Sequence, residues 1–427
     1  MQRRWKLATG AVIAAAAAAA YLQWMHDWRP SCRNVPSAAE AARWLNGITR
    51  SGEPFQPEYV ACIEVAAFYS RGRTGDRDLY PHPGIGVHVT TLPRAEDFAK
   101  LKGLPRLAAV DLLLDRPEPG YDDALAGSLS QIKTLRALKW QFGQGLTDAG
   151  ARRLGDLPEL ESLQLQGAVL GAGLQAWARL AKLRRLWLRD STLTADGVVA
   201  LEKLRSLEDL WISFGRVEGS LAPLARLPAL RRLQLIAAKT GDEQIGALAG
   251  APALAYLALD VEAIGPRGLA GVAKLPNLAG LAIDRAEVSG GLELLAVAPA
   301  LRGLSLHAVR LDDARAAGLG VLKNLERLSL RGSKIGDATA AALAALPALE
   351  ELDLEDTAIT DAALRALAKA PRLRTLGISG TAVTDEGLAQ LAAYPRLAEA
   401  TAYRTKATAS GIARLKAAKP SLAVRGE

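Results

Sequence analysis

The sequence predicts a solenoid of the α/β class, in which short strand–turn–helix units stack on one another. Two observations predict it. A frame of apolar residues, L-x-x-L-x-x-L-x-L, returns along most of the chain, and within each repeat a strand pattern is followed by a helix pattern. A unit of this kind buries its apolar face only against its neighbours, so the fold offers a long surface and no deep pocket.

The second leucine of the frame marks the repeats. After a first interval of 28 residues, successive marks lie 23 to 25 residues apart. The marks are Leu107, Leu135, Leu160, Leu183, Leu207, Leu230, Leu254, Leu278, Leu301, Leu325, Leu349, Leu373, Leu397 and, more weakly, Leu422. Such regular spacing indicates one repeat domain, and we expect it to span residues 104–427.

Each repeat contains a strand pattern and then a helix pattern. In one unit, Leu352 and Leu354 alternate with the polar Glu351 and Asp353, and a period of two is typical of a strand. The segment 360–368 that follows has apolar residues at helical spacing and is rich in alanine, which favours a helix.

The expected helix starts have their own signature, a Thr or Gly followed by Asp. Such pairs are Thr147-Asp148, Gly336-Asp337, Thr360-Asp361 and Thr384-Asp385. The first residue can cap the helix, and an Asp in the first turn can accept from its free N–H groups and meets the positive end of the helix dipole. We therefore interpret these residues as structural.

With these motifs the chain resembles the leucine-rich repeat family, in particular a bacterial branch whose units read L-P-x-L-x-x-L-x-L-x-x-T-x-I/V-T-D-x-G-L-x-x-L. The stretches 346–367 and 370–391 match that pattern, and the resemblance covers roughly residues 104–427. It implies a curved α/β solenoid of the ribonuclease-inhibitor-like kind, with a parallel sheet on the concave side and helices on the convex side. The resemblance does not identify a ligand.

The chain departs from the family at a turn position that often holds Asn. Several turns have a hydroxyl there, whereas others have Ala or Val. The hydroxyls belong to Ser191, Ser333, Thr357 and Thr381, and the apolar residues are Ala168, Ala238, Ala286 and Val309. We expect the turns without a hydroxyl to be less regular.

The N-terminal segment predicts export. Arg3, Arg4 and Lys6 precede an uncharged, alanine-rich stretch at residues 7–25. Basic residues ahead of an apolar run direct the run into the export machinery and keep the N-terminus inside. The sequence therefore predicts a signal peptide or signal anchor at residues 1–28 and places the repeats outside the cytoplasm.

Two fates of this segment fit the sequence. Ala18 and Ala20 offer a small-residue cleavage site, which would yield a secreted protein, whereas the stretch between Trp5 and Trp24 could just cross a bilayer. We favour a retained anchor in the inner membrane with the repeats facing the periplasm. An alanine-rich cytosolic helix is the remaining alternative.

Residues 29–103 break the period and are predicted to form an N-terminal capping region that covers the open edge of the first repeat. Strands are expected at residues 61–69 and 85–91. Cys32 and Cys62 are the two cysteines of the chain, and an even pair in an exported protein predicts a disulfide. Two buried free thiols are the alternative.

Charge and composition disfavour several classes of function. The net charge is +8, but Arg and Lys lie beside Asp and Glu in nearly every repeat, which argues against a nucleic-acid partner. The four histidines have no spacing suited to a metal, and no nucleophile elbow, P-loop or paired-carboxylate motif is present. We therefore predict no catalysis, no metal and no cofactor.

Strand residues that flank the inward leucines face the concave side and form columns along the sheet. The column between the two leucines is Lys139, Gln164, Trp187, Trp211, Gln234, Ala258, Ala282, Ser305, Ser329, Asp353, Gly377 and Thr401. Trp187 and Trp211 are neighbours in this column, separated by one strand spacing of about 4.8 Å. Around them on the same face are Arg185, Arg189, Asp209, Arg232, Gln166 and Tyr256.

This surface has two interpretations. Exposed Trp with Tyr and Arg is the composition of a binding hot spot, because each side chain buries much area at a small entropy cost. The predicted partner-binding residues are Trp187, Trp211, Arg185, Arg189, Tyr256, Arg232, Gln164 and Gln166. In the alternative, the tryptophans cover one another and the arginines stack on them by cation–π contact, which stabilises the fold without a partner.

Other conspicuous residues are interpreted as structural. Trp140 and Trp177 fall on an inward strand position and on a helix, so we expect them in the core. Arg327 and Arg331 lie one repeat from Glu351 and Glu355, and such cross-strand pairs stabilise a sheet modestly.

The leading functional hypothesis is a non-catalytic scaffold of the cell envelope that binds a protein partner on its concave face. A glycan or envelope-polymer binding module is the runner-up, in which the tryptophans stack on sugar rings and Gln164, Gln166 and Gln234 bond to hydroxyls. A third possibility is a secreted effector that binds host proteins.

Overall fold

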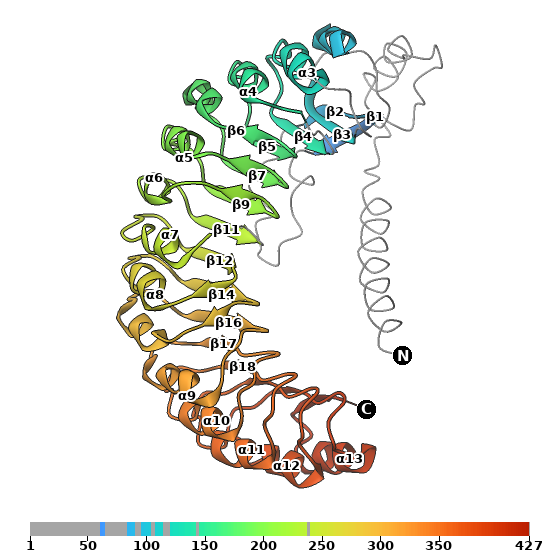
Figure 1. The fold of residues 1–427 in the computed structure, drawn as a ribbon. Coiled ribbons are helices and arrows are strands. Elements are labelled where there is room, and N and C mark those ends of the chain that lie inside the picture. Colours follow the sequence, from blue (N-terminus) through green and yellow to red (C-terminus); the bar gives the residue numbers. More distant parts are fainter. Residues whose placement is uncertain are drawn as a thin grey trace, which may run out of the picture.

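The structure is a computed structural model and describes residues 60–64, 83–89, 95–103, 107–113, 120–141, 145–236 and 240–426. These residues form a curved solenoid, with the strands on the inner side of the arc and the helices on the outer side (Figure 1). The predicted α/β leucine-rich repeat solenoid is therefore confirmed, including the sheet on the concave face and the helices on the convex face.

One sheet of 16 strands runs through the described part of the chain. Its first two strands are antiparallel, and every later neighbour is parallel. In sheet order the strands are β1 (Val60–Glu64), β2 (Pro83–Val89), β3 (Leu107–Leu113), β4 (Ala137–Gln141), β5 (Ser162–Gln166), β7 (Arg185–Arg189), β9 (Asp209–Ser213), β11 (Arg232–Ile236), β12 (Tyr256–Asp260), β14 (Gly280–Asp284), β16 (Gly303–His307), β17 (Arg327–Ser329), β18 (Glu351–Asp353), β19 (Thr375–Gly377), β20 (Glu399–Thr401) and β21 (Ala423–Arg425).

Short α- and 3₁₀-helices cover the convex side. They are η3 (Ala95–Gly103), α3 (Tyr121–Leu129), α4 (Asp148–Leu154), η4 (Ala172–Arg179), α5 (Ala195–Leu201), α6 (Ala222–Ala225), α7 (Asp242–Gly246), α8 (Pro266–Ala273), η5 (Leu292–Val297), α9 (Asp313–Ala316), η6 (Ala317–Val321), α10 (Asp337–Leu343), α11 (Asp361–Leu367), α12 (Asp385–Gln390), η7 (Leu391–Ala393) and α13 (Ala409–Ala418). A helix with its side chains is about 10 Å wide, whereas neighbouring strands lie about 4.8 Å apart, so the stack curves toward the strands.

Two-residue strands pair between the main strand and the helix of some repeats. They are β6 (Val169–Leu170), β8 (Thr192–Leu193) and β10 (Arg216–Val217) in one small sheet, and β13 (Ala263–Ile264) and β15 (Glu287–Val288) in another. These pairs repeat the parallel order of the main sheet, so they keep neighbouring repeats in the same register.

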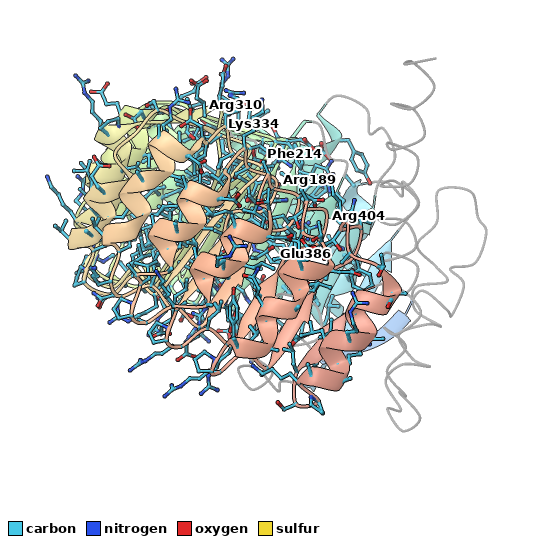
Figure 2. The ribbon with its side chains drawn as sticks, turned by 90° about the horizontal axis from the view of Figure 1, so that it is seen from below. Arg189, Phe214, Arg310, Lys334, Glu386 and Arg404 are labelled. Atoms are coloured by element: carbon cyan, nitrogen blue, oxygen red, sulfur yellow. The ribbon has the colours of Figure 1, made fainter. Side chains whose placement is uncertain are left out.

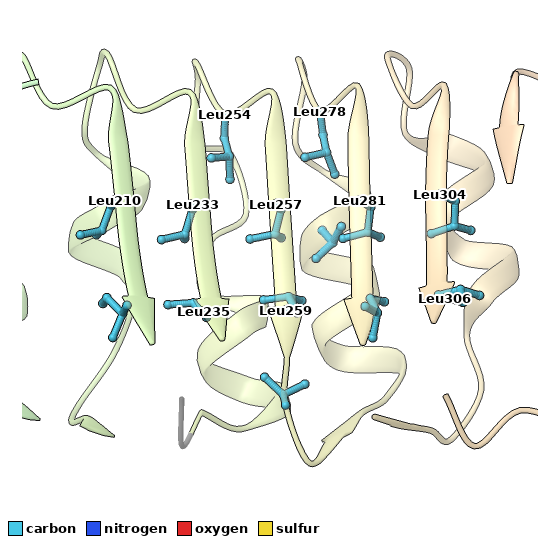
Figure 3. Close-up of a cluster of buried hydrophobic side chains, with 14 of the residues drawn as sticks. Leu210, Leu233, Leu235, Leu254, Leu257, Leu259, Leu278, Leu281, Leu304 and Leu306 are labelled. Carbon is cyan, nitrogen blue, oxygen red and sulfur yellow. The ribbon is translucent and has the colours of Figure 1, made fainter. Parts of the chain in front are cut away.

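The core consists of the inward leucines stacked repeat upon repeat. Leu233, Leu257 and Leu281 are exact register partners on β11, β12 and β14, and Figure 3 shows them side by side. A second row, which includes Leu235 and Leu259, lies one step further along the same strands. All five are buried, and burying a leucine contributes about 1.5–3 kcal/mol, so the period of the sequence is the period of the core.

Trp140 and Trp177 belong to this core, as predicted. Both side chains are fully buried, and the indole Nε1 of Trp177 donates a 2.7 Å hydrogen bond to the carbonyl oxygen of Ala151 in the preceding helix. This bond replaces the one that the Trp177 N–H would make to water.

The region before residue 104 continues the sheet. β1 and β2 overlap the strands expected at 61–69 and 85–91, but each begins one or two residues earlier and ends earlier than expected. β2 pairs with β3 of the repeats in parallel. The segment 1–28 and Cys32 lie outside the described residues, and nothing is described of the Cys62 side chain, so the anchor and the disulfide remain predictions. No helix within the described ranges is both long and apolar enough to cross a membrane.

A left-handed residue follows the strand in many repeats. The non-glycine residues with positive φ are Asp190, Phe214, Arg285, Ala308, Asp356 and Arg404, with φ between 47° and 55°. Gly167, Gly332 and Gly380 occupy the same place in other repeats. The turns before Ala168, Ala286 and Val309 share this conformation, so the expectation that they would be less regular is wrong at these three positions. Ala238 lies outside the described residues.

The aspartates at the helix starts join one repeat to the next. Asp361 accepts from the backbone N–H of Thr384 at 2.8 Å and from its hydroxyl at 2.6 Å. Asp385 does the same for Thr408, at 2.6 and 2.8 Å. The sequence analysis expected each Asp to accept from the free N–H groups of its own helix. The structure corrects this, because the carboxylate binds the N-cap of the following repeat, 23 residues later.

The glycine of the T-D-x-G pattern lies against this carboxylate. A methyl group at Gly387 would collide with Asp361, and one at Gly411 would collide with Asp385. Where the position holds Ala363 instead, its N–H is 3.2 Å from the Asp337 carboxylate, compared with 3.0 Å for Gly150 and Asp123. Glycine is therefore not essential for this contact.

This ladder of carboxylates predicts a loss of stability in acid. Hydrogen bonds from the Thr408 backbone and hydroxyl lower the pKa of Asp385 below its usual value of 3.8, with Arg414 adding to the effect. A group with a lowered folded-state pKa stabilises the fold above its unfolded-state pKa, and this contribution is lost as the pH falls through the folded-state value. We expect the unfolding midpoint in urea to fall below about pH 4.

Asp385→Asn tests the assignment. The variant should be less stable than the wild type at neutral pH, and the difference should shrink in acid, where the wild-type carboxylate is protonated. Glu386→Gln is the matched control, since Glu386 is the exposed carboxylate next in the chain, and it should follow the wild-type profile. A stability difference between Asp385→Asn and the wild type that stays constant with pH would contradict the role given to these carboxylates.

Candidate functional site

The two concave tryptophans lie where the sequence analysis placed them. Trp187 on β7 and Trp211 on β9 are direct register partners, with ring centroids 5.3 Å apart and ring planes at 69°. Edge-to-face pairs of this kind are favourable because the positive ring edge of one meets the negative face of the other, and they add about 0.5–1.5 kcal/mol beyond burial. Both side chains are partly exposed.

A row of charged residues lies beside the tryptophans. Arg185, Asp209, Arg232 and Tyr256 are register partners on β7, β9, β11 and β12. Arg232 binds Asp209 through two contacts, one from Nε to Oδ1 and one of 2.8 Å from Nη2 to Oδ2. A bidentate pair fixes the guanidinium plane, so Arg232 has a defined position on this face.

The glutamine side of the surface depends on Asp190, which the sequence analysis did not select. Gln166 donates a 2.9 Å hydrogen bond from Nε2 to Asp190 Oδ2, and Arg189 Nε lies 3.5 Å from the same oxygen. Gln164 is the register partner of Trp187 on the neighbouring β5. Asp190 thus links the ends of β5 and β7.

Phe214 is the functional candidate that the sequence analysis missed. It is 58% exposed, it has a φ of 55°, and the Arg189 guanidinium lies over its ring at 5.8 Å from the centroid. Figure 2 shows the two side chains next to each other. The alternative interpretation placed the arginines on the tryptophans, whereas Arg189 makes its cation–π contact with Phe214.

The sequence contained one signal for Phe214. The turn position that it occupies holds Gly167 and Asp190 in the two preceding repeats, and both residue types tolerate a left-handed backbone. A bulky aromatic residue with positive φ is rare, and backbone strain of this kind concentrates at functional sites. If the turn residues of all repeats are aligned in one column, Phe214 is the bulky aromatic exception.

Tyr256 lies at the far side of the surface, on β12. Its side chain is partly exposed, and its ring leans over the neighbouring strand, because a methyl group at Gly280 would lie 2.9 Å from Tyr256 Cδ2. Burial, with a smaller contribution from the Asp284 carboxylate, raises the pKa of the Tyr256 hydroxyl. The hydroxyl is therefore protonated and can donate at neutral pH.

The predicted site residues thus fall on five neighbouring strands. Trp187, Trp211, Arg185, Arg189 and Arg232 lie together on β7, β9 and β11. Gln164 and Gln166 flank them on β5, and Tyr256 flanks them on β12. Their role in binding stays a prediction.

The charged residues further along the concave face form a structural network. Arg331 lies 2.9 Å from Glu355, as the sequence suggested, and the hydroxyls of Ser379 and Thr401 donate to the same carboxylate at 2.9 and 2.7 Å. Arg327 is in register with Glu351, but the carboxylate within ion-pair distance is Glu326, at 3.9 Å. This network ties together the strands from β17 to β20.

Among the side chains that the structure describes, no group of three or more His, Cys, Asp or Glu residues is arranged to hold a metal ion.

Comparison with known proteins agrees with the fold. The family model described as Leucine Rich repeat matches residues 346–368. A search of curated proteins gives no match. An internalin of Listeria monocytogenes is 19% identical, covers 74% of this chain and 86% of its own, and has a TM-score of 0.51.

Two further solved structures are similar. A leucine-rich repeat protein of Leptospira interrogans is 17% identical, covers 79% of this chain and 88% of its own, and has a TM-score of 0.58. Mouse RP105, solved in complex with MD-1, is also 17% identical, with coverages of 80% and 69% and a TM-score of 0.50. At such identities the likeness concerns the fold. The chain therefore has the leucine-rich repeat solenoid fold, and one of its repeats, residues 346–368, matches the family model.

Proposed function

We propose that the protein is a non-catalytic scaffold that binds a protein partner on the concave face between β5 and β12. The observation that carries this proposal is the pairing of Trp187 and Trp211 within a frame of fixed arginines. Aromatic and arginine side chains dominate binding hot spots, and their positions here are set before a partner arrives, which lowers the entropy cost of binding.

Two further observations support a protein partner. A solenoid presents an extended surface, which suits a macromolecule better than a small molecule. Mouse RP105, which has a similar fold, was solved as a complex with another protein, MD-1. The curved sheet of this chain offers a comparable surface, and its site residues lie on rigid strands.

The ring geometry argues against the glycan alternative. Sugar rings stack flat on aromatic faces, so a sugar platform needs neighbouring faces in one plane. Trp187 and Trp211 are inclined by 69°, and the edge of one ring meets the face of the other. The pair therefore fits the irregular side chains of a protein better than a flat sugar ring.

The proposed location is the cell envelope. The basic residues and apolar stretch of residues 1–28 favour export and a retained anchor in the inner membrane, with the repeats facing the periplasm. Under this proposal residues 29–103 cap the solenoid, residues 104–427 form the repeat domain, and Cys32 and Cys62 form a disulfide. We also propose that the repeats belong to the bacterial branch with the T-D-x-G-L pattern.

Substitution of the tryptophans tests the site. A partner is first captured by crosslinking the native envelope fraction and is then purified, so that its affinity can be measured by calorimetry. We expect Trp187→Ala and Trp211→Ala each to weaken binding by about 2 kcal/mol or more, which is about 30-fold, because each removes a hot-spot side chain. Circular dichroism should show that both variants stay folded.

Tyr403→Ala is the matched control, since Tyr403 is an exposed aromatic residue just after β20, far along the same sheet. It should bind the partner like the wild type. If both tryptophan variants bind with full affinity and Tyr403→Ala loses affinity, the binding site lies at the other end of the arc and the proposed face is wrong.

Phe214→Gly separates binding from stability. Glycine adopts positive φ without strain, which is worth about 1–2 kcal/mol, and this offsets the entropy that glycine loses on folding. We expect the unfolding free energy to stay within about 1 kcal/mol of the wild type, while partner affinity falls because Phe214 and its contact with Arg189 are lost.

Ala308→Gly provides the control for this substitution. Ala308 occupies the same turn position with a φ of 52° and is also exposed, but it has no aromatic ring. It should leave the affinity unchanged. Equal affinities for Phe214→Gly, Ala308→Gly and the wild type would remove Phe214 from the binding surface.

A further inference from the structure

Charge is distributed unevenly along the repeats. Residues 240–360 contain 10 basic and 16 acidic side chains, whereas residues 361–426 contain 11 basic and 4 acidic ones. The second stretch therefore has a net charge of +7, compared with +8 for the whole chain. It holds α11, α12 and α13, which lie side by side at the C-terminal end of the arc (Figure 1). This end of the solenoid has a strong local excess of positive charge.

Five of these basic residues gather where the helices end and the chain turns into the next strand. Four of the five are exposed. Lys419 Nζ donates a hydrogen bond to the carbonyl oxygen of Tyr394, so the end of α13 lies against the turn that carries Arg396. We call these residues the basic edge, which consists of Lys369, Arg372, Arg396, Lys416 and Lys419.

Two arginines of the basic edge face one another. Arg372 and Arg396 each lie three residues before the first residue of a strand, β19 and β20, and these first residues are register partners. The same place before β5 and β7 holds Glu159 and Lys182, and Lys182 Nζ lies 2.6 Å from the Glu159 carboxylate. Side chains at this place are therefore within reach of one another. Near β19 and β20 the chain has two like charges where other repeats form an ion pair, and like charges at this distance are unfavourable.

The helix dipole accounts for only part of this charge. Basic side chains near the C-terminal end of a helix are favourable, because the dipole is negative there, and this explains Lys369 and Lys416. Arg372 and Arg396 each come directly after a proline, outside the helices. Their mutual repulsion is not offset by a helix end, which points to an anionic ligand.

The carboxylates of this stretch lie elsewhere. Asp361 and Asp385 bind the N-caps of the following repeats, at the opposite ends of the helices. Glu386 is at the start of α12, and Glu399 lies 3.0 Å from Arg425. Within the described part of the chain, no carboxylate lies within ion-pair distance of the basic edge.

The basic edge also has no apolar anchor. Tyr403 is the one large hydrophobic side chain that is exposed within the described residues 361–426, and it follows β20, whereas the basic edge precedes the strands. A protein interface normally has an apolar centre with aromatic anchors. Lipid headgroups need no such anchor, because basic side chains meet them by charge alone. The surface therefore suits an anionic bilayer better than a protein.

We infer that the basic edge binds the headgroups of an anionic phospholipid bilayer. This inference rests on the proposed location at the inner membrane, because headgroups are the polyanion that lies next to the chain there. Each Lys or Arg near an anionic bilayer raises the affinity about fivefold, so a cluster of this size holds the surface in a salt-dependent way. Trp187 and Trp211 lie several repeats away, so the protein partner and the bilayer can be bound together.

Lysine acetylation of the full-length protein, followed by mass spectrometry, tests this inference. The protein is mixed with vesicles of phosphatidylcholine alone or of phosphatidylcholine and phosphatidylglycerol. Lys369 and Lys416 should be acetylated more slowly on the anionic vesicles. Lys203 and Lys274 are matched internal controls, since they are exposed and occupy the same place in their repeats as Lys369. Their acetylation rates should be the same on both vesicles.

Neutralising the two arginines gives the expected magnitude. In the double variant Arg372→Gln/Arg396→Gln, the lipid concentration that half-protects Lys369 should rise about 30-fold, because two basic residues are lost. The matched control is Arg152→Gln/Arg153→Gln, which removes two exposed arginines from α4 and should behave like the wild type. Salt at about 0.5 M should remove the protection, since it screens exposed charges.

Three results would overturn the inference. Equal acetylation of Lys369 on both kinds of vesicle would show that the basic edge does not meet the headgroups. Equal slowing of Lys203 and Lys274 would show a general attraction from the net charge of +8. Equal protection by soluble polyglutamate, at the same concentration of negative charge, would show a site for acidic polypeptides and not for a bilayer.

The same experiments separate this inference from the proposed function. Flotation with phosphatidylcholine vesicles reports on the N-terminal segment alone, so a protein that does not float with them contradicts the proposed location, whatever the acetylation of Lys369. The variant Arg372→Gln/Arg396→Gln should bind the protein partner like the wild type. Loss of partner binding in this variant would place the basic edge in the partner interface and overturn the assignment to a bilayer.

Discussion

The structure depends on the one-to-one parallel register of the strands. Each inward leucine meets the leucine of the next repeat, and this match buries both side chains completely. A shift by one residue would turn every leucine outward, because successive side chains in a strand point to opposite faces. The same match aligns the outward residues, so the concave surface is a consequence of core packing.

A second set of contacts keeps the outer side in step with the inner side. The Asp carboxylates at the helix starts bind the N-caps of the following repeats, and the short strands between sheet and helix pair in parallel. Each repeat is therefore joined to its neighbour by leucines, by backbone hydrogen bonds and by a carboxylate. Stability of this kind is a sum over neighbouring repeats, and it allows single surface residues to vary for function.

The sequence predicted the parts of the molecule that follow from period alone. The leucine frame predicted the strands, their register and the contact between Trp187 and Trp211, because a repeat places the same position of each unit in one column. The buried state of Trp140 and Trp177 followed from the same reasoning. Period says nothing about how a turn residue is oriented or which neighbour a polar side chain reaches.

The features that the sequence did not predict are turn conformations and the contacts of polar side chains. Arg189 bends over Phe214 because the chain turns through a left-handed residue after β9, and that conformation is not visible in the leucine pattern. The aspartates of the helix starts were assigned to their own helices because the sequence alone did not reveal the cap of the next repeat.

The most direct test of this account is the far-ultraviolet circular dichroism of the two concave tryptophans. Two indoles at 5.3 Å and 69° couple their excitations and give a pair of bands of opposite sign. We predict that Trp187→Phe and Trp211→Phe each remove the same pair of bands, and that the double variant removes nothing more. Bands that persist in either variant, or losses that add in the double variant, would show that the rings are not neighbours and that the register is wrong.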